Sequence, residues 1–387
     1  MITKLLALPS TVWTLGFVSL LNDAASDMVY PLLPLYLASV LGAGPAAIGL
    51  IEGVAESVSS VCKLLSGLIA DRIPRSKPLV VIGYALAAIS RPLIVLAATW
   101  PLVLLLRFVD RVGKGLRSAP RDAILAASIE PSRRGLAFGL QRGMDNAGAV
   151  VGPLIAWVLL RQGTDIADII VWTAVPGLLT VALAGTIDEP LREKPSTPAG
   201  FSISVQWMPV RLKRYLLVLA LFSLGNSSNM FLLLQAKSVG ISESQIPLLW
   251  GLASLTATLL SPLLAGLSDS LGRTRLISLG WILYGLFYLA LGFQFHFVGW
   301  IWGAFASYGV FMAATEGAEK ALIADFAPTE RLGSAYGWFN LTTGITLLPA
   351  SLLFGTIWEF TNPMTAFGFA AACSITAAIL LKHWVRA

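Results

Sequence analysis

The chain has 387 residues, of which 56% are hydrophobic and only 12% are charged, and its formal net charge is +6. A soluble domain carries about 25% charged residues, so this chain has too few charges to cover its own surface in water and is expected in a lipid bilayer. The basic excess does not indicate a nucleic-acid partner, because lysine and arginine lie at alternate helix ends rather than in one patch.

Apolar segments of about 20 residues, the length that crosses a bilayer as a helix, recur along the whole chain. Counting them predicts an all-α membrane protein with twelve transmembrane helices. The first six are expected over 10–38, 46–70, 78–98, 101–126, 135–160 and 166–187. The last six are expected over 214–236, 245–270, 274–294, 297–324, 332–358 and 362–382. The polar stretch 188–213 is the expected linker between an N-terminal bundle over 1–187 and a C-terminal bundle over 214–387.

The distribution of lysine and arginine among the loops predicts the orientation of the chain in the membrane. The linker and the loops after the second, fourth and eighth helices are basic, whereas 39–46 and 97–101 carry no charge. Both termini and the linker are therefore expected in the cytoplasm, as in a multi-pass protein of a bacterial-type inner membrane.

A short signature occurs twice, 198 positions apart, each time between two apolar runs. Residues 67–77 read Gly-Leu-Ile-Ala-Asp-Arg-Ile-Pro-Arg-Ser-Lys, and residues 265–275 read Ala-Gly-Leu-Ser-Asp-Ser-Leu-Gly-Arg-Thr-Arg. A second pair keeps the same offset, Gly-Leu-Ala-Phe-Gly over 135–139 and Gly-Ser-Ala-Tyr-Gly over 333–337. Repeats at a fixed offset in an apolar chain indicate two equivalent halves, an architecture typical of transporters.

The repeated signature resembles the Gly-x-x-x-Asp-(Arg)-x-Gly-Arg-(Arg/Lys) motif that follows the second and eighth helices of the major facilitator superfamily. The resemblance implies two pseudo-symmetric six-helix bundles, and gates in which each motif's aspartate pairs with basic residues and a helix N-terminus. Pro74 stands where the first copy would have glycine, and Ala265 replaces the first glycine of the second copy. Since glycine lets helices approach closely, the second gate is expected to be looser. The residues placed at the gates are Gly67, Asp71, Arg72, Arg75, Lys77, Asp269, Arg273 and Arg275.

The fourth predicted helix carries five cations on one face, namely Arg107, Arg111, Lys114, Arg117 and Arg121. One ionisable group at the bilayer centre costs about 2.5–3.5 kcal/mol on insertion scales, so this face is expected to line a wet path or to be neutralised. Arg111 and Gly115 also resemble the superfamily's helix-four Arg-x-x-x-Gly motif, which implies a role in proton coupling. Arg107 is a competing assignment for that arginine, and Arg117 and Arg121, near the cytoplasmic end, have the alternative of snorkelling to the membrane surface.

Acidic and polar partners lie on neighbouring predicted helices. Eight intramembrane cations face seven anions in the first half, so most charges can pair internally and the arginines alone do not establish an anionic substrate. The second half is neutral-polar and aromatic with few charges: at the 198-residue offset, arginines 107, 111, 117 and 142 become Phe305, Gly309, Thr315 and Asn340. This contrast predicts proton coupling in the first half and solute contacts shared by both.

The candidate residues come from both halves. The candidates for proton coupling are Asp23, Asp27, Asp110, Arg111 and Glu316. The candidates for solute binding are Tyr30, Glu56, Arg107, Lys114, Arg142, Asp145, Asn226, Asn229, Glu319 and Asn340. On the fifth predicted helix, Gly148, Gly152 and Pro153 partly resemble the signature of proton-antiporting drug exporters, although Ala156 and Trp157 replace its final glycine pair. Close helix packing is the alternative explanation for these glycines.

The sequence has no phosphate-binding loop, serine nucleophile elbow or histidine–cysteine metal cluster. We therefore expect a monomeric, proton-coupled secondary transporter without cofactor or metal, rather than an enzyme. The expected activity is efflux of a small amphiphilic or drug-like compound. The main alternative is transport of an organic anion, such as a polycarboxylate or a siderophore. An intramembrane enzyme acting on a lipid is less favoured because of the equivalent halves and doubled gate loops. A receptor or scaffold is less favoured because it would not need so dense a row of intramembrane charges or short loops throughout.

Overall fold

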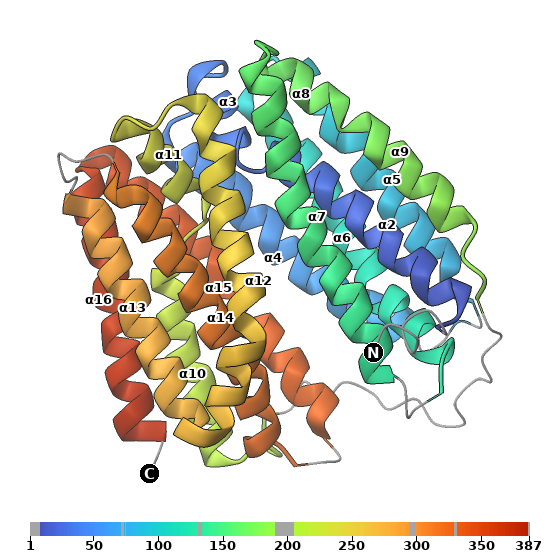
Figure 1. Cartoon of the computed structure of the whole chain (residues 1–387). Coiled ribbons are helices and arrows are strands. Elements are labelled where there is room, and N and C mark those ends of the chain that lie inside the picture. The colour runs from blue at the N-terminus through green and yellow to red at the C-terminus, as the bar shows by residue number, and fades with distance from the viewer. Residues whose placement is uncertain are drawn as a thin grey trace. The chain divides into compact units, whose positions relative to one another are not determined.

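The structure is a computed structural model of the chain. It describes residues 8–70, 73, 75–130, 134–189, 205–293, 299–328 and 331–385. Within these residues every regular element is helical, as Figure 1 shows. The all-α fold predicted from the apolar segments is therefore confirmed.

The helices of the first half follow the predicted spans closely. They are α2 (Ser10–Val29), α3 (Leu33–Ser39), α4 (Pro45–Ala70), α5 (Lys77–Leu93) with a 3-10 turn over Ile94–Leu96, α6 (Trp100–Ala127), α7 (Arg134–Arg161), α8 (Ile166–Trp172) and α9 (Ala174–Gly185). The helices of the second half are α10 (Val210–Gly225), α11 (Met230–Ser238), α12 (Ile246–Leu271), α13 (Arg273–Phe293), α14 (Trp300–Phe326), α15 (Leu332–Phe360) and α16 (Pro363–Leu380), which continues as a π-helical turn over Leu381–Val385.

Three predicted spans are each broken into two helices, namely α2 with α3, α8 with α9, and α10 with α11. Counting each broken span once gives twelve helical segments in the described residues, as predicted. Helix α10 begins at Val210, inside the stretch that the sequence assigns to the linker, and residues 190–204 of that stretch lie outside the described residues.

Local sequence explains where several helices begin. Proline occupies the first turn of α5, α6 and α16, where its missing N–H group costs no hydrogen bond. At α16 the side chain of Asn362 also accepts a hydrogen bond of 2.9 Å from the Thr365 N–H group, which caps the helix. Gly272 separates α12 from α13 with a φ of +90°, a conformation that only glycine adopts without strain.

Among the described residues, seven helical segments are long and apolar enough to cross a membrane by length and composition alone. Helix α6, which carries the row of arginines, is not among them. Large apolar side chains such as Leu178, Leu217 and Leu263 are exposed on the outer faces of the helices. Such faces are expected where lipid, rather than water, is the solvent.

The chain divides into two compact units. Unit 1 comprises the described residues of Met1–Tyr36 and Val58–Gly200, and unit 2 those of Leu37–Ser57 and Phe201–Ala387. Helix α4 crosses the boundary, so its first half packs with the helices of unit 2, whereas the sequence assigns the whole helix to the N-terminal bundle. The position of the boundary between the bundles stays a prediction.

Both units pack their helices in the same pattern. In unit 1, α2 packs on α7 and α9, and α5 packs on α6 and α9. In unit 2, α10 packs on α15 and α16, and α13 packs on α14 and α16. Each helix of the first set is replaced by its counterpart in the second, so the two halves are structurally equivalent, as the repeats in the sequence predict.

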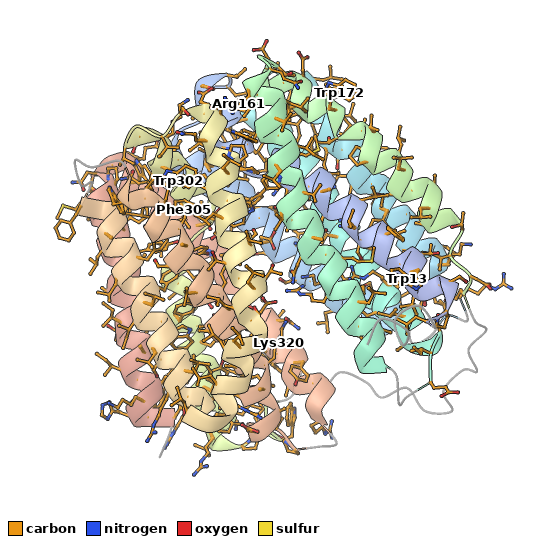
Figure 2. All side chains as sticks on the ribbon, viewed as in Figure 1. Trp13, Arg161, Trp172, Trp302, Phe305 and Lys320 are labelled. Carbon is orange, nitrogen blue, oxygen red and sulfur yellow. The ribbon has the colours of Figure 1, made fainter. Side chains whose placement is uncertain are left out.

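The two units differ in what fills their interiors. An apolar core in unit 1 joins Leu15 of α2, Tyr84 of α5 and Ile124 of α6. In unit 2 the largest buried side chains are aromatic, among them Trp281 and Phe305, the second of which is labelled in Figure 2. The buried charged groups of unit 1 lie outside this apolar core, on the same helices.

Candidate functional site

A buried cluster of charges, here called the arginine cluster, consists of Arg91, Arg107, Asp110 and Arg111 in unit 1. Each of the four side chains is at most 5% exposed. One carboxylate oxygen of Asp110 accepts a hydrogen bond of 3.1 Å from Arg91 Nε, and the other accepts one of 3.3 Å from Arg107 Nη1. The second oxygen also lies 3.8 Å from Arg111 Nη1. Asp110 thus offsets one of the three positive charges of the cluster, each of which would be very costly to bury without an anion nearby.

The arginine cluster depends on close contact between α5 and α6. A Cβ atom on Gly83 would lie 2.6 Å from the carbonyl oxygen of Gly113, and one on Gly113 would lie 2.5 Å from that of Gly83. Only glycine lets the two backbones approach this closely. The approach brings Arg91 of α5 to Asp110 of α6, and Arg91 Nη1 also donates to the backbone oxygen of Asn22 on α2, at 3.1 Å.

A second group, the acid–amide cluster, joins Ser19 of α2, Arg121 of α6, and Gln141 and Asp145 of α7. The amide of Gln141 donates to Asp145 Oδ2 at 2.7 Å and to Ser19 Oγ at 3.1 Å. Arg121 Nη1 donates to Ser19 Oγ at 3.1 Å and lies 3.6 Å from Asp145 Oδ1. Among the described residues, that buried Oδ1 atom has no hydrogen-bond partner. Asp145 is therefore held more loosely than Asp110.

Two residues lie between these clusters. Asp23 accepts a hydrogen bond of 2.8 Å from Asn22 and interacts electrostatically with Asp145, Arg117, Arg121 and Lys114. Arg117 is buried, with its guanidinium carbon 4.6 Å from the centre of the Tyr84 ring, a cation–π geometry. Its Nη1 atom also donates to the Gly83 oxygen, at 3.4 Å.

The first helix of each half is broken at an equivalent place. Helix α2 ends at Val29 and α3 begins at Leu33, with Tyr30 and Pro31 between them. Helix α10 ends at Gly225 and α11 begins at Met230. Because Tyr30 corresponds to Ser228 at the 198-residue offset, the two interruptions occupy matching positions in the repeat.

The break in unit 2 exposes amide groups to a cluster of aromatic hydroxyls, here called the tyrosine–amide cluster. Tyr308 donates to Asn229 Oδ1 at 2.6 Å, and Tyr284 donates to Asn226 Oδ1 at 3.3 Å and to the Gly225 oxygen at 3.0 Å. The Tyr284 and Tyr288 rings are stacked, with centroids 4.2 Å apart. This site offers rings and neutral hydrogen-bonding groups but no charge.

The two predicted acids of α14, Glu316 and Glu319, have other partners than the tyrosine–amide cluster. Glu319 accepts a hydrogen bond of 3.0 Å from Trp281 Nε1 on α13. Glu316 is exposed and pairs with Lys320, one turn later and labelled in Figure 2, at 3.5 Å. The candidates of unit 2 are therefore distributed along α10, α13 and α14 rather than gathered at one point.

The other predicted site residues vary in exposure. Asp27, Tyr30 and Lys114 are half-buried in unit 1, and Glu56 is half-buried but belongs to unit 2. Arg142 of α7 and Asn340 of α15 are exposed, and they occupy equivalent positions in the two halves. The functional roles of all these candidates stay predictions.

The gate residues are only partly described. Asp71 and Arg72 lie outside the described residues, as does the side chain of Asp269. Gly67 lies near Ala119 of α6, Arg75 and Arg275 are exposed, and Arg273 donates to the Ala321 oxygen at 2.6 Å and pairs with Asp325 at 2.5 Å. The N–H groups of Ser76 and Lys77 donate to the Glu189 carboxylate at 2.6 and 2.8 Å. A glutamate after α9 thus caps the start of α5.

Sequence reasoning did not select several residues that the structure brings into these clusters. Arg91 is one of the eight intramembrane cations of the first half, to which the sequence gives no role of its own, and Glu189 lies in the expected linker over 188–213. Tyr284 and Tyr288 lie four residues apart on α13, a spacing that places them on one helical face and that would have indicated an aromatic site. Within the described residues, no group of three histidine, cysteine, aspartate or glutamate side chains is arranged to hold a metal ion.

Comparison with protein families gives a match along most of the chain. A sequence model of the Major Facilitator Superfamily matches residues 15–236 and 215–387. An uncharacterised MFS-type transporter of Methanocaldococcus jannaschii is 34% identical over 386 residues, which cover 97% of this chain and 94% of that protein. The multidrug resistance protein MdtH of Photorhabdus laumondii is 32% identical over 133 residues, about a third of each chain (34% and 33%).

Solved transporter structures have the same fold. A variant of the nucleoside transporter NupG aligns with a TM-score of 0.82 and 14% identity, covering 96% of this chain and 99% of that one. The peptide transporter POT in complex with sulfate aligns with a TM-score of 0.80 and 13% identity, covering 97% and 94%. At these identities the likeness is one of fold.

Proposed function

Because the chain belongs to the major facilitator superfamily and is a multi-pass membrane transporter rather than an enzyme, we propose that it is a proton-coupled exporter of small amphiphilic or drug-like compounds. Transport would proceed by alternating access, with the proton gradient as the source of energy. We place both termini on the cytoplasmic side of the inner membrane, from the basic loops.

The observation that carries this proposal is the pair of helix breaks. Helices α2 and α3 are interrupted at Tyr30, and α10 and α11 at residues 226–229, in matching positions of the two halves. In secondary transporters, interrupted helices at corresponding places of two repeats mark the binding site, because the unwound backbone offers polar groups inside the membrane. The break therefore supports a solute site near Tyr30 in unit 1 and near Asn226 and Asn229 in unit 2.

The chemistry of the tyrosine–amide cluster supports an amphiphilic solute. The stacked rings of Tyr284 and Tyr288 are fully buried, so they would add apolar contact area for a solute only where the surrounding helices separate, and the hydroxyl and amide groups beside them supply neutral hydrogen bonds. Pockets that take drug-like molecules combine mostly apolar walls with a few polar groups in this way. The partial likeness to a multidrug resistance protein, over about a third of each chain (34% and 33%), favours the same class of solute and the export direction.

Asp145, which the sequence places among the solute-binding candidates, is the carboxylate that we propose carries the coupled proton. Asp110 has both oxygens engaged by arginines, so protonation there would leave several buried cations without their anion. Asp145 Oδ1 has no hydrogen-bond partner among the described residues and faces Arg121 at 3.6 Å. A proton on that atom would weaken the attraction to Arg121, which retains its bonds to Asp122 and Ser19.

Protonation of Asp145 would therefore loosen one link between α6 and α7 without dismantling the rest of unit 1. A ligand shifts a two-state equilibrium only through its different affinity for the two states, and a proton meets this condition if it binds the looser state better. Asp23, which interacts electrostatically with Asp145 and Arg121, is a second candidate on the same path. Asp27, Arg111 and Glu316 remain further candidates for coupling.

An organic anion is the alternative solute. Arg142 is an exposed cation on α7, and Arg107 and Arg111 lie on the neighbouring helix α6. A carboxylate-bearing solute would find its partner at Arg142 and would lose it in Arg142→Gln, whereas a cationic amphiphile would be transported as well or better by that variant.

The test uses the purified chain in proteoliposomes with a pH-sensitive dye inside and an imposed proton gradient. Cationic amphiphiles, carboxylates and anionic chelators are added one at a time. The proposal expects a cationic amphiphile to dissipate the gradient, Asp145→Asn to abolish this movement, and Asp122→Asn, on the half-exposed partner of the same arginine, to retain it. If only anions dissipate the proton gradient, and Arg142→Gln abolishes this, the organic-anion alternative is established. If no solute dissipates the gradient, proton coupling is refuted.

A further inference from the structure

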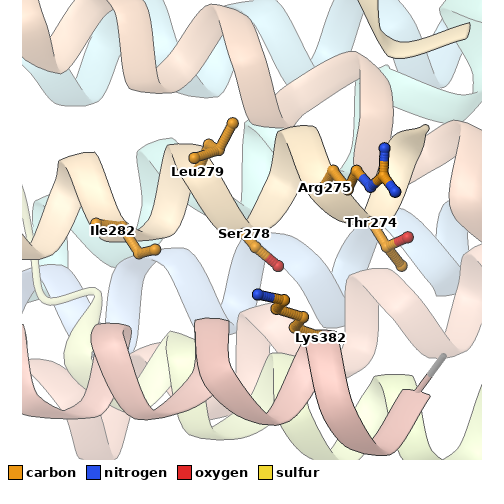
Figure 3. A pocket seen from close by; sticks show the side chains of 6 residues that line it. All are labelled: Thr274, Arg275, Ser278, Leu279, Ile282 and Lys382. Carbon is orange, nitrogen blue, oxygen red and sulfur yellow. The ribbon is translucent and has the colours of Figure 1, made fainter. Parts of the chain in front are cut away.

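A cavity of about 260 Å³ lies on unit 2 between α13 and the end of α16. Its lining combines two cations, two hydroxyls and two aliphatic side chains, namely Arg275, Lys382, Thr274, Ser278, Leu279 and Ile282. Figure 3 shows Lys382 extending from the α16 side toward Ser278 of α13. Arg275 belongs to the predicted gate motif, and the other five lining residues have no role in the gate motif or in the transport proposal.

Both cations that line this cavity lie at the surface of unit 2. Arg275 and Lys382 are both exposed, and among the described residues neither is within 4.0 Å of a carboxylate oxygen in any ion pair found. Helix α13 begins at Arg273, so the positive end of its dipole lies beside Thr274 and Arg275 and favours negative charge at the same point. Two cations and a helix N-terminus thus converge on one cavity.

The surface next to these cations is apolar and faces outward. On α13, Leu279 is 57% exposed and Leu286 is 54% exposed, and with Arg275 and Ile282 they follow the 4-3-4 spacing of a single helical face. On α16, Ile379 is 53% exposed and lies one turn before Lys382. Helix α13 therefore presents a cation at its end and an aliphatic stripe along the span, and α16 adds one exposed aliphatic side chain next to its cation.

The cavity and the apolar surface beside it form a groove between α13 and α16. At the bottom of this groove the two helices are in direct contact. Ser278 Oγ donates to the backbone oxygen of Ala378 at 3.3 Å. A Cβ atom on Gly285 would lie 2.8 Å from Ile375 Cγ1, so the helices touch again two turns further along the span. The groove is thus a shallow surface channel between packed helices, open along its outer side.

We propose that this groove binds an anionic phospholipid, with the headgroup phosphate between Arg275 and Lys382 and one acyl chain along Leu279, Ile282 and Ile379. Basic pockets between transmembrane helices at the cytoplasmic surface suit anionic headgroups, and the basic loops predict that this end of α13 is cytoplasmic. A free phosphate would use the cations but would gain nothing from the aliphatic stripes. The lipid would bridge α13 and α16 from outside, independently of the transported solute.

The test measures binding of phosphatidylglycerol and phosphatidylcholine to the detergent-solubilised full chain by native mass spectrometry. The wild-type chain should retain phosphatidylglycerol in preference to phosphatidylcholine. Removing both cations in Arg275→Gln/Lys382→Gln should reduce that preference by roughly tenfold or more. The matched control Arg211→Gln/Lys213→Gln removes two cations from the first turn of α10, outside the cavity, and should leave the preference unchanged.

Two outcomes would overturn the proposal. Equal losses in both double variants would mean that total charge, rather than this groove, selects the lipid. Displacement of the lipid by millimolar inorganic phosphate, with no effect of Leu279→Ser on lipid binding, would identify a free-anion site instead. Because Leu279 and both cations are exposed, their replacement leaves the packed interior intact, and unchanged thermal melting of each variant confirms that it has folded.

Discussion

In unit 1, α5 and α6 bury a carboxylate among arginines, whereas the equivalent helices of unit 2, α13 and α14, bury aromatic rings. Arg91 and Arg107 converge on Asp110 in the first case. In the second, the Trp281 ring stacks on Phe222 of α10 with centroids 4.4 Å apart. The helices around both interiors pack in the same pattern. One architecture therefore supports two kinds of interior, so the fold alone does not determine which half handles charge.

The two interiors differ in how they respond to change. Buried charges tolerate few rearrangements, because each loses more by desolvation than it gains unless its partner is in place. Aromatic rings with neutral hydroxyls tolerate shifts, because their contacts are non-directional and their hydrogen bonds can be exchanged for others. This difference favours unit 1 as the half whose state depends on one proton, and unit 2 as the half that adapts to solutes of different shape.

The largest expected effect comes from breaking the arginine cluster with Asp110→Asn. The substitution removes the anion shared by arginines that are almost fully buried, and breaking a buried pair in this way costs about 3–5 kcal/mol of stability. The measurement is the unfolding midpoint of the purified chain in detergent. Asp122→Asn is the matched control: its carboxylate is 48% exposed and pairs with Arg121, so its loss should cost at most about 1 kcal/mol. Equal destabilisation of the two variants would contradict a structural role for the cluster.

Much of the fold could be predicted because its signals are local. Apolar runs bounded by charged loops predict helix limits that agree with those of the structure to within four residues, as at Val210, where 214 was expected. The repeat predicts two equivalent halves, since a 198-residue offset preserves the loop motif. In the sequence, the breaks at Tyr30 and at 226–229 are only polar or proline-containing stretches. They are recognised as a pair once the structure shows that a helix is interrupted at each of them.

The sequence predicts that the buried cations and anions nearly balance, but it does not predict which of them pair. Helical periodicity places Arg107 and Arg111 on one face of α6, yet it does not tell which neighbouring helix that face meets. The contact of Arg91 with Asp110 depends on the close approach of Gly83 and Gly113, a tertiary event. The aspartates of the gate motif lie outside the described residues, in whole or in their side chains, so their roles rest on the resemblance alone.

A middle-sized effect is expected from Gly148→Ala, which tests why α2 and α7 pack so closely. A Cβ atom there would lie 2.5 Å from the Leu20 carbonyl oxygen and 3.0 Å from the Ala24 nitrogen, so the helices must separate. Overpacking of this kind costs about 1–3 kcal/mol. The control on the same helix is Gly143→Ala, where nothing lies within 4 Å of the new atom. That variant should unfold at the same midpoint or slightly higher, since alanine favours helix by up to about 1 kcal/mol.

The same substitution sharpens the comparison between the halves. At the 198-residue offset, Gly148 and Gly152 become Thr346 and Ala350 on α15, so unit 2 packs its corresponding helices around side chains rather than backbone. Thr346→Ala should therefore change stability by less than Gly148→Ala does. If Gly148→Ala and Gly143→Ala unfold alike, the close α2–α7 contact does not depend on glycine, and the exporter-like glycine motif of α7 would have to be explained by something other than packing.

The smallest expected effect is that of Tyr308→Phe in the tyrosine–amide cluster. The change removes one hydroxyl and its 2.6 Å hydrogen bond to Asn229 while keeping the ring, so it should cost about 1 kcal/mol. Tyr336→Phe, which removes an exposed hydroxyl bonded to the Lys320 oxygen at 3.2 Å, is the control and should cost less. The more informative readout is the affinity for an exported amphiphile, measured by its quenching of tryptophan fluorescence. If unit 2 adapts to its solutes, Tyr308→Phe should weaken some compounds and leave others unchanged, because a solute can use the freed Asn229 oxygen in place of the tyrosine. A uniform loss for every compound would instead indicate a rigid, single-solute site, and the contrast between a charged half that is fixed and a neutral half that adapts would then fail.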